Sequence, residues 1–118
     1  MLKKKYRLPK RDGAIVFKQG KTTKDILFLI KSKKNDLPYS RFAFVVPLKI
    51  EKKSTKRNKI RRRVYEILRH QYKFIKKGFD ILIILQDPEI SKKKYLEIEK
   101  ELKNALQKAK LLTLEGAT

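Results

Sequence analysis

The chain has 118 residues, a length typical of one domain that buries a modest core, and we expect residues 1–118 to form a single domain. It has no cysteine, which excludes disulfides and thiolate metal sites, and its longest apolar run is too short to cross a bilayer. Its formal net charge of +21 predicts a polyanionic partner, which the charge alone leaves open between nucleic acid, anionic membrane and acidic protein. We expect a folded, soluble, cytoplasmic protein.

The first part of the chain predicts one helix followed by two strands. Residues 9–18 suit a helix whose opening proline takes the first helical position, and Gly20 is placed to end it. Residues 26–30 and residues 41–46 are β-rich runs, and residues 32–38 between them are typical of a loop. We therefore expect the two strands to pair as a hairpin.

Three phenylalanines are candidates for either core packing or base stacking. Alternation places Phe42 and Phe44 on one face of the second strand, and apolar residues at strand spacing usually belong to the core. Similar aromatic arrangements also form stacking platforms for single-stranded bases. Phe17, on the first helix, is evenly balanced between these two roles.

A long helix and a central strand follow. From Ser54 or Thr55, either of which is a candidate N-cap, helical spacing predicts one apolar stripe. Residues 76–78 end the helix, and residues 79–85 are nearly all apolar, as in a central strand covered on both faces. A strand, a helix and a strand in this order imply a parallel crossover. The stripe consists of Ile60, Val64, Ile67, Leu68, Gln71 and Ile75.

The chain ends in a second amphipathic helix. Asp87 and Pro88 end the central strand, and Ser91 is a candidate cap for the helix. No repeat and no long linker divides the chain, so the pattern indicates one α/β sandwich. The apolar stripe of the last helix consists of Tyr95, Ile98, Leu102, Ala105, Leu106 and Ala109.

The sequence KKSTKRNKIRRRVYE, residues 52–66, concentrates positive charge on the long helix. Arg57, Arg61 and Tyr65 share one ridge, with Asn58 and Arg62 beside it, opposite the apolar stripe. An ordinary solvated helix would mix charges of both signs, whereas this one places like charges together. Arginine suits bidentate phosphate recognition, and the helix N-terminus adds unpaired amides. We expect this face to bind a phosphate backbone, with Tyr65 as a stacking candidate.

Protein-side catalysis is not expected. General acid-base or metal chemistry needs convergent His, Asp, Glu or Cys side chains. The single histidine, His70, is on the basic helix, where a surface imidazole is the usual role, and Asp80 and Asp87 stand at the two ends of one strand. The sequence has no glycine-rich phosphate loop and no nucleophile elbow. We predict no catalytic residue and no protein-bound metal or cofactor.

The chain resembles the protein subunit of bacterial ribonuclease P. That family's signature, an Arg-Asn pair followed one turn later by two basic residues, stands here as RNKIRR at residues 57–62. RLPKRDGAIVFKQGK resembles the family's first helix, RFAFVV its central strand, and FDILIIL with the final helix its C-terminal half. The resemblance covers nearly the whole chain.

This resemblance implies a two-layer α+β or α/β domain of order αβββαβα with a left-handed βαβ crossover, whereas the general rule for crossovers predicts the right hand. It also implies a role in removing the 5′ leader of precursor tRNA, in which a large RNA subunit holds the Mg²⁺ and performs the hydrolysis. The implied partners are the ribonuclease P RNA and precursor tRNA, with no membrane. The oligomeric state is left open.

The resemblance also assigns candidate site residues. Phe17 matches an aromatic of the family's leader-binding cleft, whereas Gly13 replaces a second one. Tyr65 stands where the family usually has another arginine, and residues 47–49 replace a Ser-Lys-Lys step. The candidate RNA-binding set consists of Arg57, Asn58, Arg61 and Arg62, the weaker matches Lys49 and Lys59, and the adjoining Lys53, Lys56 and Tyr65.

Two alternatives fit the charge. A ribosomal or other structural RNA-binding protein would carry the same basic helix. A DNA-binding helix module fits less well, because the sequence shows no helix-turn-helix pairing and no dimer seam. The RNA that remains attached after purification at moderate salt distinguishes the first alternative from a ribonuclease P subunit.

Overall fold

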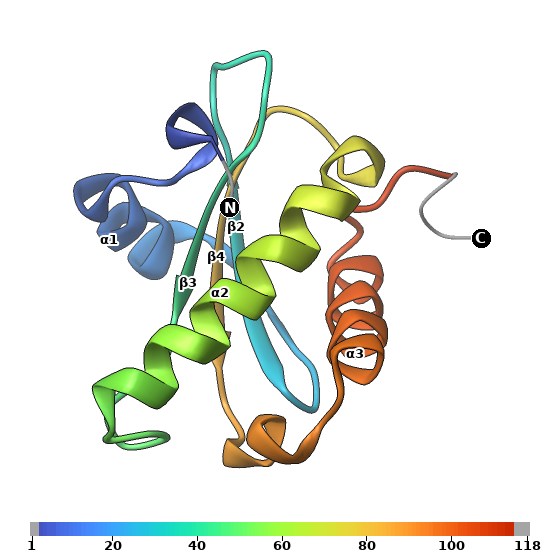
Figure 1. The fold of residues 1–118 in the computed structure, drawn as a ribbon. Helices are drawn as coiled ribbons and strands as arrows, with labels where there is room; N and C mark the ends of the chain where they lie inside the picture. The colour runs from blue at the N-terminus through green and yellow to red at the C-terminus, as the bar shows by residue number, and fades with distance from the viewer. Residues whose placement is uncertain (1–2, 115–118) are drawn as a thin grey trace.

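The computed structural model describes residues 3–114, which form a four-stranded sheet with helices on both faces (Figure 1). The elements occur in the order that the resemblance implies, αβββαβα, with three short 3₁₀-helices added. In chain order they are η1 (Lys4–Tyr6), α1 (Lys10–Gln19), β1 (Lys21–Lys24), β2 (Phe28–Lys34), β3 (Arg41–Val45), α2 (Ser54–Gln71), η2 (Tyr72–Phe74), β4 (Phe79–Leu85), η3 (Pro88–Lys92) and α3 (Tyr95–Lys108).

The strand order in the sheet is β1-β2-β4-β3. β4 pairs antiparallel with β2 and parallel with β3, so α2 forms the predicted parallel crossover between β3 and β4. The predicted hairpin of residues 26–30 with residues 41–46 is wrong, because β4 lies between β2 and β3. The almost wholly apolar β4 needs cover on both faces, which the centre of the sheet provides. The hand of the crossover stays a prediction from the resemblance.

The hairpin that does form joins β1 to β2. The sequence of β1, KTTK, has no apolar residue, so its strand character was missed. β2 also continues to Lys34 into the predicted loop, because its last residue pairs with Phe79. Gly20 ends α1 as predicted, since a Cβ there would lie 2.5 Å from the carbonyl oxygen of Val16.

The two long helices begin differently from the prediction. Pro9 precedes α1 as its N-cap residue, and Lys53 rather than Ser54 or Thr55 is the N-cap of α2. α2 also ends earlier than predicted, at Gln71, and the chain continues through η2 before Gly78, whose φ of +87° suits a glycine, leads into β4.

Ser91 does not cap α3. It lies in η3, where its hydroxyl donates to the carbonyl oxygen of Pro88 at 3.1 Å. The first turn of α3 is instead closed by Glu97, whose carboxylate accepts a hydrogen bond from the backbone N–H of Lys94 at 2.9 Å. The residues of both predicted stripes are buried apart from the half-buried Tyr95, but Ile75 follows the end of α2 and Ala109 is the C-cap residue of α3.

The two faces of the sheet carry unequal cores. Figure 1 shows α2 and α3 on one face and α1 on the other. The large cluster beneath α2 and α3 contains Phe42 and Phe44, which settles both as core residues rather than stacking platforms. Beneath α1 the buried cluster consists of Leu8, Val16 and Leu82 only. No helix within residues 3–114 is long and apolar enough to cross a membrane.

Candidate nucleic-acid interface

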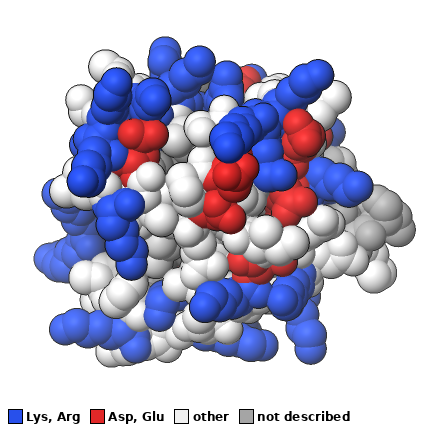
Figure 2. Space-filling model, turned by 90° about the horizontal axis from the view of Figure 1, so that it is seen from below, with Lys and Arg blue, Asp and Glu red and all other residues white. Residues whose placement is uncertain are grey.

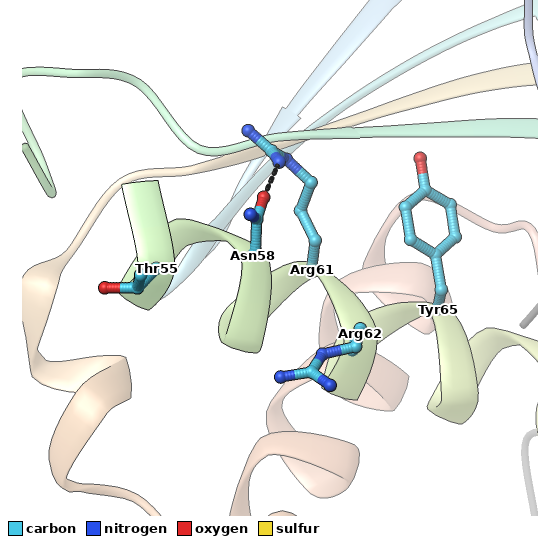
Figure 3. Close-up of a pocket in the computed structure, with 5 residues that line it drawn as sticks. All are labelled: Thr55, Asn58, Arg61, Arg62 and Tyr65. Atoms are coloured by element: carbon cyan, nitrogen blue, oxygen red, sulfur yellow. Dashed lines mark hydrogen bonds between the residues drawn. The ribbon is translucent and has the colours of Figure 1, made fainter. Parts of the chain in front are cut away.

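The solvent side of α2 carries a shallow pocket of about 500 Å³ (Figure 3). Its lining includes three residues of the predicted motif, Asn58, Arg61 and Arg62, together with Thr55 and Tyr65. The helix brings these residues together because they stand three and four positions apart. The apolar stripe on the other side of the helix holds α2 against the sheet, so the pocket faces outward.

Within this pocket Arg61 is held by its neighbour. Its guanidinium Nη1 donates to the side-chain oxygen of Asn58 at 2.6 Å. Figure 3 shows both side chains on the same side of α2 as Tyr65, with Arg62 pointing in a different direction. A guanidinium has five N–H donors, so Arg61 keeps most of them for a ligand while Asn58 fixes its orientation. The pair is suited to bidentate recognition of a phosphate.

Arg57 makes contacts that its place in the motif does not predict. Its Nη1 donates to the carbonyl oxygens of Glu51 at 3.2 Å and of Lys52 at 2.7 Å. These bonds tie the segment before α2 to the first turns of the helix. Arg57 therefore organises the entry to α2, and its remaining guanidinium donors are available to an anion.

Tyr65 is engaged with the sheet. Its hydroxyl oxygen accepts a hydrogen bond from the backbone N–H of Phe44 at 3.0 Å, and its ring packs against the large core cluster. Because β3 is an edge strand, this N–H has no partner strand on that side. The Tyr65 hydroxyl thus supplies an acceptor for a backbone N–H at the edge of the sheet. Only part of its ring lines the pocket as a stacking surface.

The candidate lysines surround the start of α2 and are exposed. Lys49 lies in the turn that precedes the helix, Lys53 is the N-cap residue, and Lys56 and Lys59 follow in the first two turns. The first turn has no acidic residue, although the positive end of the helix dipole favours anions there. Among the residues that the structure describes, none of these lysines has an ion-pair partner. The carboxylate nearest to this end in the sequence is that of Glu51, which accepts a hydrogen bond from the backbone N–H of Lys53 at 3.2 Å and leaves the lysine ammonium groups unpaired among the described residues.

The second half of α2 is balanced by an acidic residue. The Glu66 carboxylate lies 2.5 Å from Nη2 of Arg69 and 3.2 Å from Nε2 of His70. The hydrogen bond from Arg69 lowers the pKa of Glu66 from 4.5 to about 2. His70 is exposed, as predicted for a surface imidazole. The arginines and lysines of α2 without an acidic partner among the described residues thus lie at Arg63 and before it.

Phe17 lies on α1, beyond the opposite face of the sheet, with 53% of its surface exposed. The Nζ of Lys31, from β2, lies 4.6 Å from the ring centroid and donates to the carbonyl oxygen of Phe17 at 3.0 Å. The structure therefore does not bring Phe17 together with the motif residues of α2. It holds the ring outward, where a planar group can reach it.

A partly buried ion network near α1 was missed in the sequence. Arg41 donates from Nε and Nη2 to the two carboxylate oxygens of Asp80 at 2.9 and 2.7 Å. Its Nη1 lies 3.3 Å from Asp12 on α1, and Asn35 donates to Asp80 at 2.8 Å. The hydrogen bond to Asp80 raises the pKa of Arg41. The network joins α1, β3 and β4. Its signal in the sequence is a basic residue, Arg41, at the start of one apolar strand and an acidic residue, Asp80, near the start of the other.

Comparison with known proteins places this arrangement in a family. The Ribonuclease P family model matches residues 2–110. The chain belongs to the ribonuclease P protein family. It is 31% identical over 121 aligned positions to the ribonuclease P protein component of Clostridium beijerinckii, covering 96% of this chain and 95% of that one. It is 44% identical over 75 residues to the protein component of Thermotoga maritima, covering 64% of this chain and 63% of that one.

Solved structures show the same relationship. The ribonuclease P protein of Thermotoga maritima, solved in complex with 1-(4-fluorophenyl)-2-thiourea, matches with a TM-score of 0.79 and 37% identity, over 86% of this chain and 97% of that one. The family match identifies the family to which the motif helix belongs, which the net charge alone did not. In this ribonuclease P family chain, the RNKIRR segment lies on the outward face of α2 apart from Ile60, which is buried in the core.

Proposed function

We propose that this chain is the non-catalytic protein subunit of ribonuclease P, which binds the RNA subunit through α2 and supports removal of the 5′ leader from precursor tRNA. The observation that carries the proposal is the row of cations on the N-terminal half of α2. These side chains lack acidic partners among the described residues and stand beside the oriented Arg61–Asn58 pair. Family membership supports the identity of the complex.

The residues of the interface have different tasks in this proposal. Arg61 and Arg62 bind phosphate oxygens, and Asn58 orients Arg61. Lys49, Lys53, Lys56 and Lys59 add charge around the start of the helix, which strengthens binding in a salt-dependent way. Arg57 holds the entry segment so that these charges have a fixed arrangement.

Phe17 is proposed as one contact for the 5′ leader. Its exposed ring offers a stacking surface, and Lys31 beside it offers charge to a passing phosphate. Because α1 and α2 cover opposite faces of the sheet, the leader and the RNA subunit would contact different sides of the protein.

Mg²⁺ is assigned to the RNA subunit in this proposal. Within residues 3–114 no three His, Cys, Asp or Glu side chains form a group that could hold a metal ion. The Asp12 and Asp80 carboxylates near α1 are both engaged by Arg41. The described residues therefore do not fit a Mg²⁺ site, and we assign them no chemical step.

Reconstitution tests the proposal. The chain is mixed with a bacterial ribonuclease P RNA at low Mg²⁺, and leader removal from precursor tRNA is measured. We expect faster leader removal and tighter substrate binding than with RNA alone; no improvement in either quantity would contradict the proposal. RNA co-purified at moderate salt should be ribonuclease P RNA, whereas ribosomal RNA would favour a structural role.

Substitutions of the motif residues test their assignment to the RNA interface. Arg61→Ala and Arg57→Ala are each expected to weaken RNA binding by about 1–3 kcal/mol, the range for hydrogen bonds to ionised groups. Arg69→Ala is the matched control, because the Arg69 charge is already paired with Glu66 and its loss should change affinity much less. Unchanged binding in both motif variants would show that the motif face is not the RNA interface.

A further inference from the structure

A second basic groove runs along α2 on the side that faces η3 and α3. One hollow of about 300 Å³ is lined by Lys56, Lys59, Ile60, Arg63 and Ser91. The next hollow, of about 420 Å³, shares Lys59 and Arg63 with the first, includes Arg62 from the motif pocket, and extends to Glu66 and Tyr95. The three cations are spaced by three and four positions, so they form one row on this flank.

The cations of the groove are unpaired, because the one carboxylate in its described lining, that of Glu66, is engaged with Arg69 and His70. Among the described residues, the side chains of Lys56, Lys59 and Arg63 have no hydrogen-bond or ion-pair partner. The Ser91 hydroxyl gives its hydrogen to the carbonyl oxygen of Pro88, so it adds no donor. Three neighbouring like charges on one helix destabilise it, and an anion in the groove would offset that cost.

Figure 2 views the end of the molecule where α2 begins and η3 lies. Lys and Arg side chains surround most of this face, and the acidic side chains lie mainly inside that rim. The nearest acidic residue in η3, Glu89, is engaged with Lys92 at 3.4 Å. The cations of the motif pocket and those of the second groove lie on the same helix, α2.

We propose that the row of Lys56, Lys59 and Arg63 is a second phosphate site, which binds a separate segment of RNA backbone from the one held by Asn58 and Arg61. Arg62 lines both hollows and lies between the two sites. An α-helix with its side chains is about 10–12 Å across, so the two flanks of α2 present phosphate sites to two backbone segments on either side of it. Arg63 lies on the second flank and outside the RNKIRR signature. This inference rests on the proposed RNA-binding function and deepens it.

The first test compares charge-removing variants of the two flanks. Lys56→Gln/Arg63→Gln is expected to weaken binding of ribonuclease P RNA on the order of tenfold or more. It should also reduce the slope of log K against log salt by roughly 0.7–0.9 for each phosphate that the protein no longer neutralises. Arg63→Lys keeps the charge and should keep most of the affinity. Thermal melts of the free proteins check that the variants fold.

The outcomes separate this inference from the proposed function. Weaker binding by Arg61→Ala with unchanged binding by Lys56→Gln/Arg63→Gln would overturn the second site and leave the proposed function intact. Unchanged binding by both variants would contradict both. Weaker binding by both variants, with additive effects, supports two independent phosphate sites.

The second test maps the RNA directly. Because the chain has no cysteine, Ser91→Cys and Thr55→Cys each provide one attachment point for a tethered cleavage reagent. We expect the Ser91 probe to cut a segment distinct from the one cut by the Thr55 probe. End-labelled ribonuclease P RNA and end-labelled precursor tRNA, tested separately, identify the source of the phosphate. Identical cuts from both positions, or none from Ser91, would overturn the second site; Lys100→Cys on α3 is the control.

Discussion

The sheet face beneath α2 and α3 is filled by a continuous apolar cluster, whereas the small cluster that the described residues form beneath α1 consists of Leu8, Val16 and Leu82, with Ala43 and Ile84 half-buried against it. The α1 face has less apolar burial. The ion pairs of the Arg41 network, which joins α1 to β3 and β4, partly take its place. One face thus carries most of the hydrophobic stability. The other face leaves apolar and aromatic surface such as Phe17 exposed to a ligand.

The largest expected effect compares two leucines of β4 that point to opposite faces. Leu85 is 1% exposed in the large cluster, and Leu82 is 5% exposed in the small one. We expect Leu85→Ala to lower the free energy of unfolding by about 3–5 kcal/mol and Leu82→Ala by about 2 kcal/mol, because fewer atoms surround the second cavity. Urea denaturation of both variants measures the difference, and equal losses would contradict the unequal division of the core.

The ion network gives the next largest effect. Arg41→Met leaves the carboxylates of Asp80 and Asp12 without their cation, and we expect a loss of about 2–3 kcal/mol in unfolding free energy, below the range for fully buried pairs. The Arg41 and Asp80 side chains keep 18% and 11% of their surface exposed, which limits the penalty. The double variant Arg41→Met/Asp80→Asn should recover part of the loss. A double variant less stable than Arg41→Met would contradict this account.

These two faces also explain what could be predicted from the sequence. The apolar run of residues 79–85 and the periodicity of both amphipathic helices identified many residues of the large cluster, because dense apolar burial leaves a recognisable pattern in the sequence. The KTTK strand shows no such apolar pattern, because its side chains are mostly exposed and its pairing depends on β2. The predicted hairpin of residues 26–30 with residues 41–46 is wrong because strands that follow one another in the sequence were taken as partners. In the sheet, β4 lies between β2 and β3.

The candidate site was predictable to a similar extent. Helical spacing placed Asn58, Arg61 and Arg62 together on the outer face, and the structure confirms that placement. The contacts of Arg57 with backbone carbonyls depend on the path of the preceding segment, which no side-chain pattern encodes. The Arg41–Asp80 pair depends on the parallel register of β3 and β4, which is fixed only by the whole sheet.

Tyr65 packs against the large core cluster and also lines the motif pocket. Its variants therefore test how stability and RNA binding are divided on the α2 side of the sheet. Tyr65→Phe removes the acceptor for the N–H of Phe44 and is expected to cost about 1 kcal/mol in unfolding free energy, with RNA affinity nearly unchanged. Tyr65→Arg should cost more stability but increase RNA affinity. Denaturation and RNA titration of both variants test this division, and a large loss of RNA affinity in Tyr65→Phe would assign the hydroxyl to the RNA interface.

The smallest effect concerns the balanced half of α2. Because Arg69 lowers the pKa of Glu66 from 4.5 to about 2, their interaction stabilises the folded state fully above pH 4.5 and is lost as the pH falls through about 2. Both side chains are partly exposed, so solvent screening keeps the contribution small. Because Glu66 also lies 3.2 Å from His70, comparing the unfolding free energy of His70→Gln/Glu66→Gln with that of His70→Gln from pH 7 to pH 2 isolates the Arg69 pair. The difference should stay constant down to about pH 4.5 and then shrink, whereas a difference that grew on acidification would show that Glu66 destabilises the fold. At neutral pH the double variant should bind RNA slightly more tightly than His70→Gln, because it releases Arg69 and removes a carboxylate that lines the second groove.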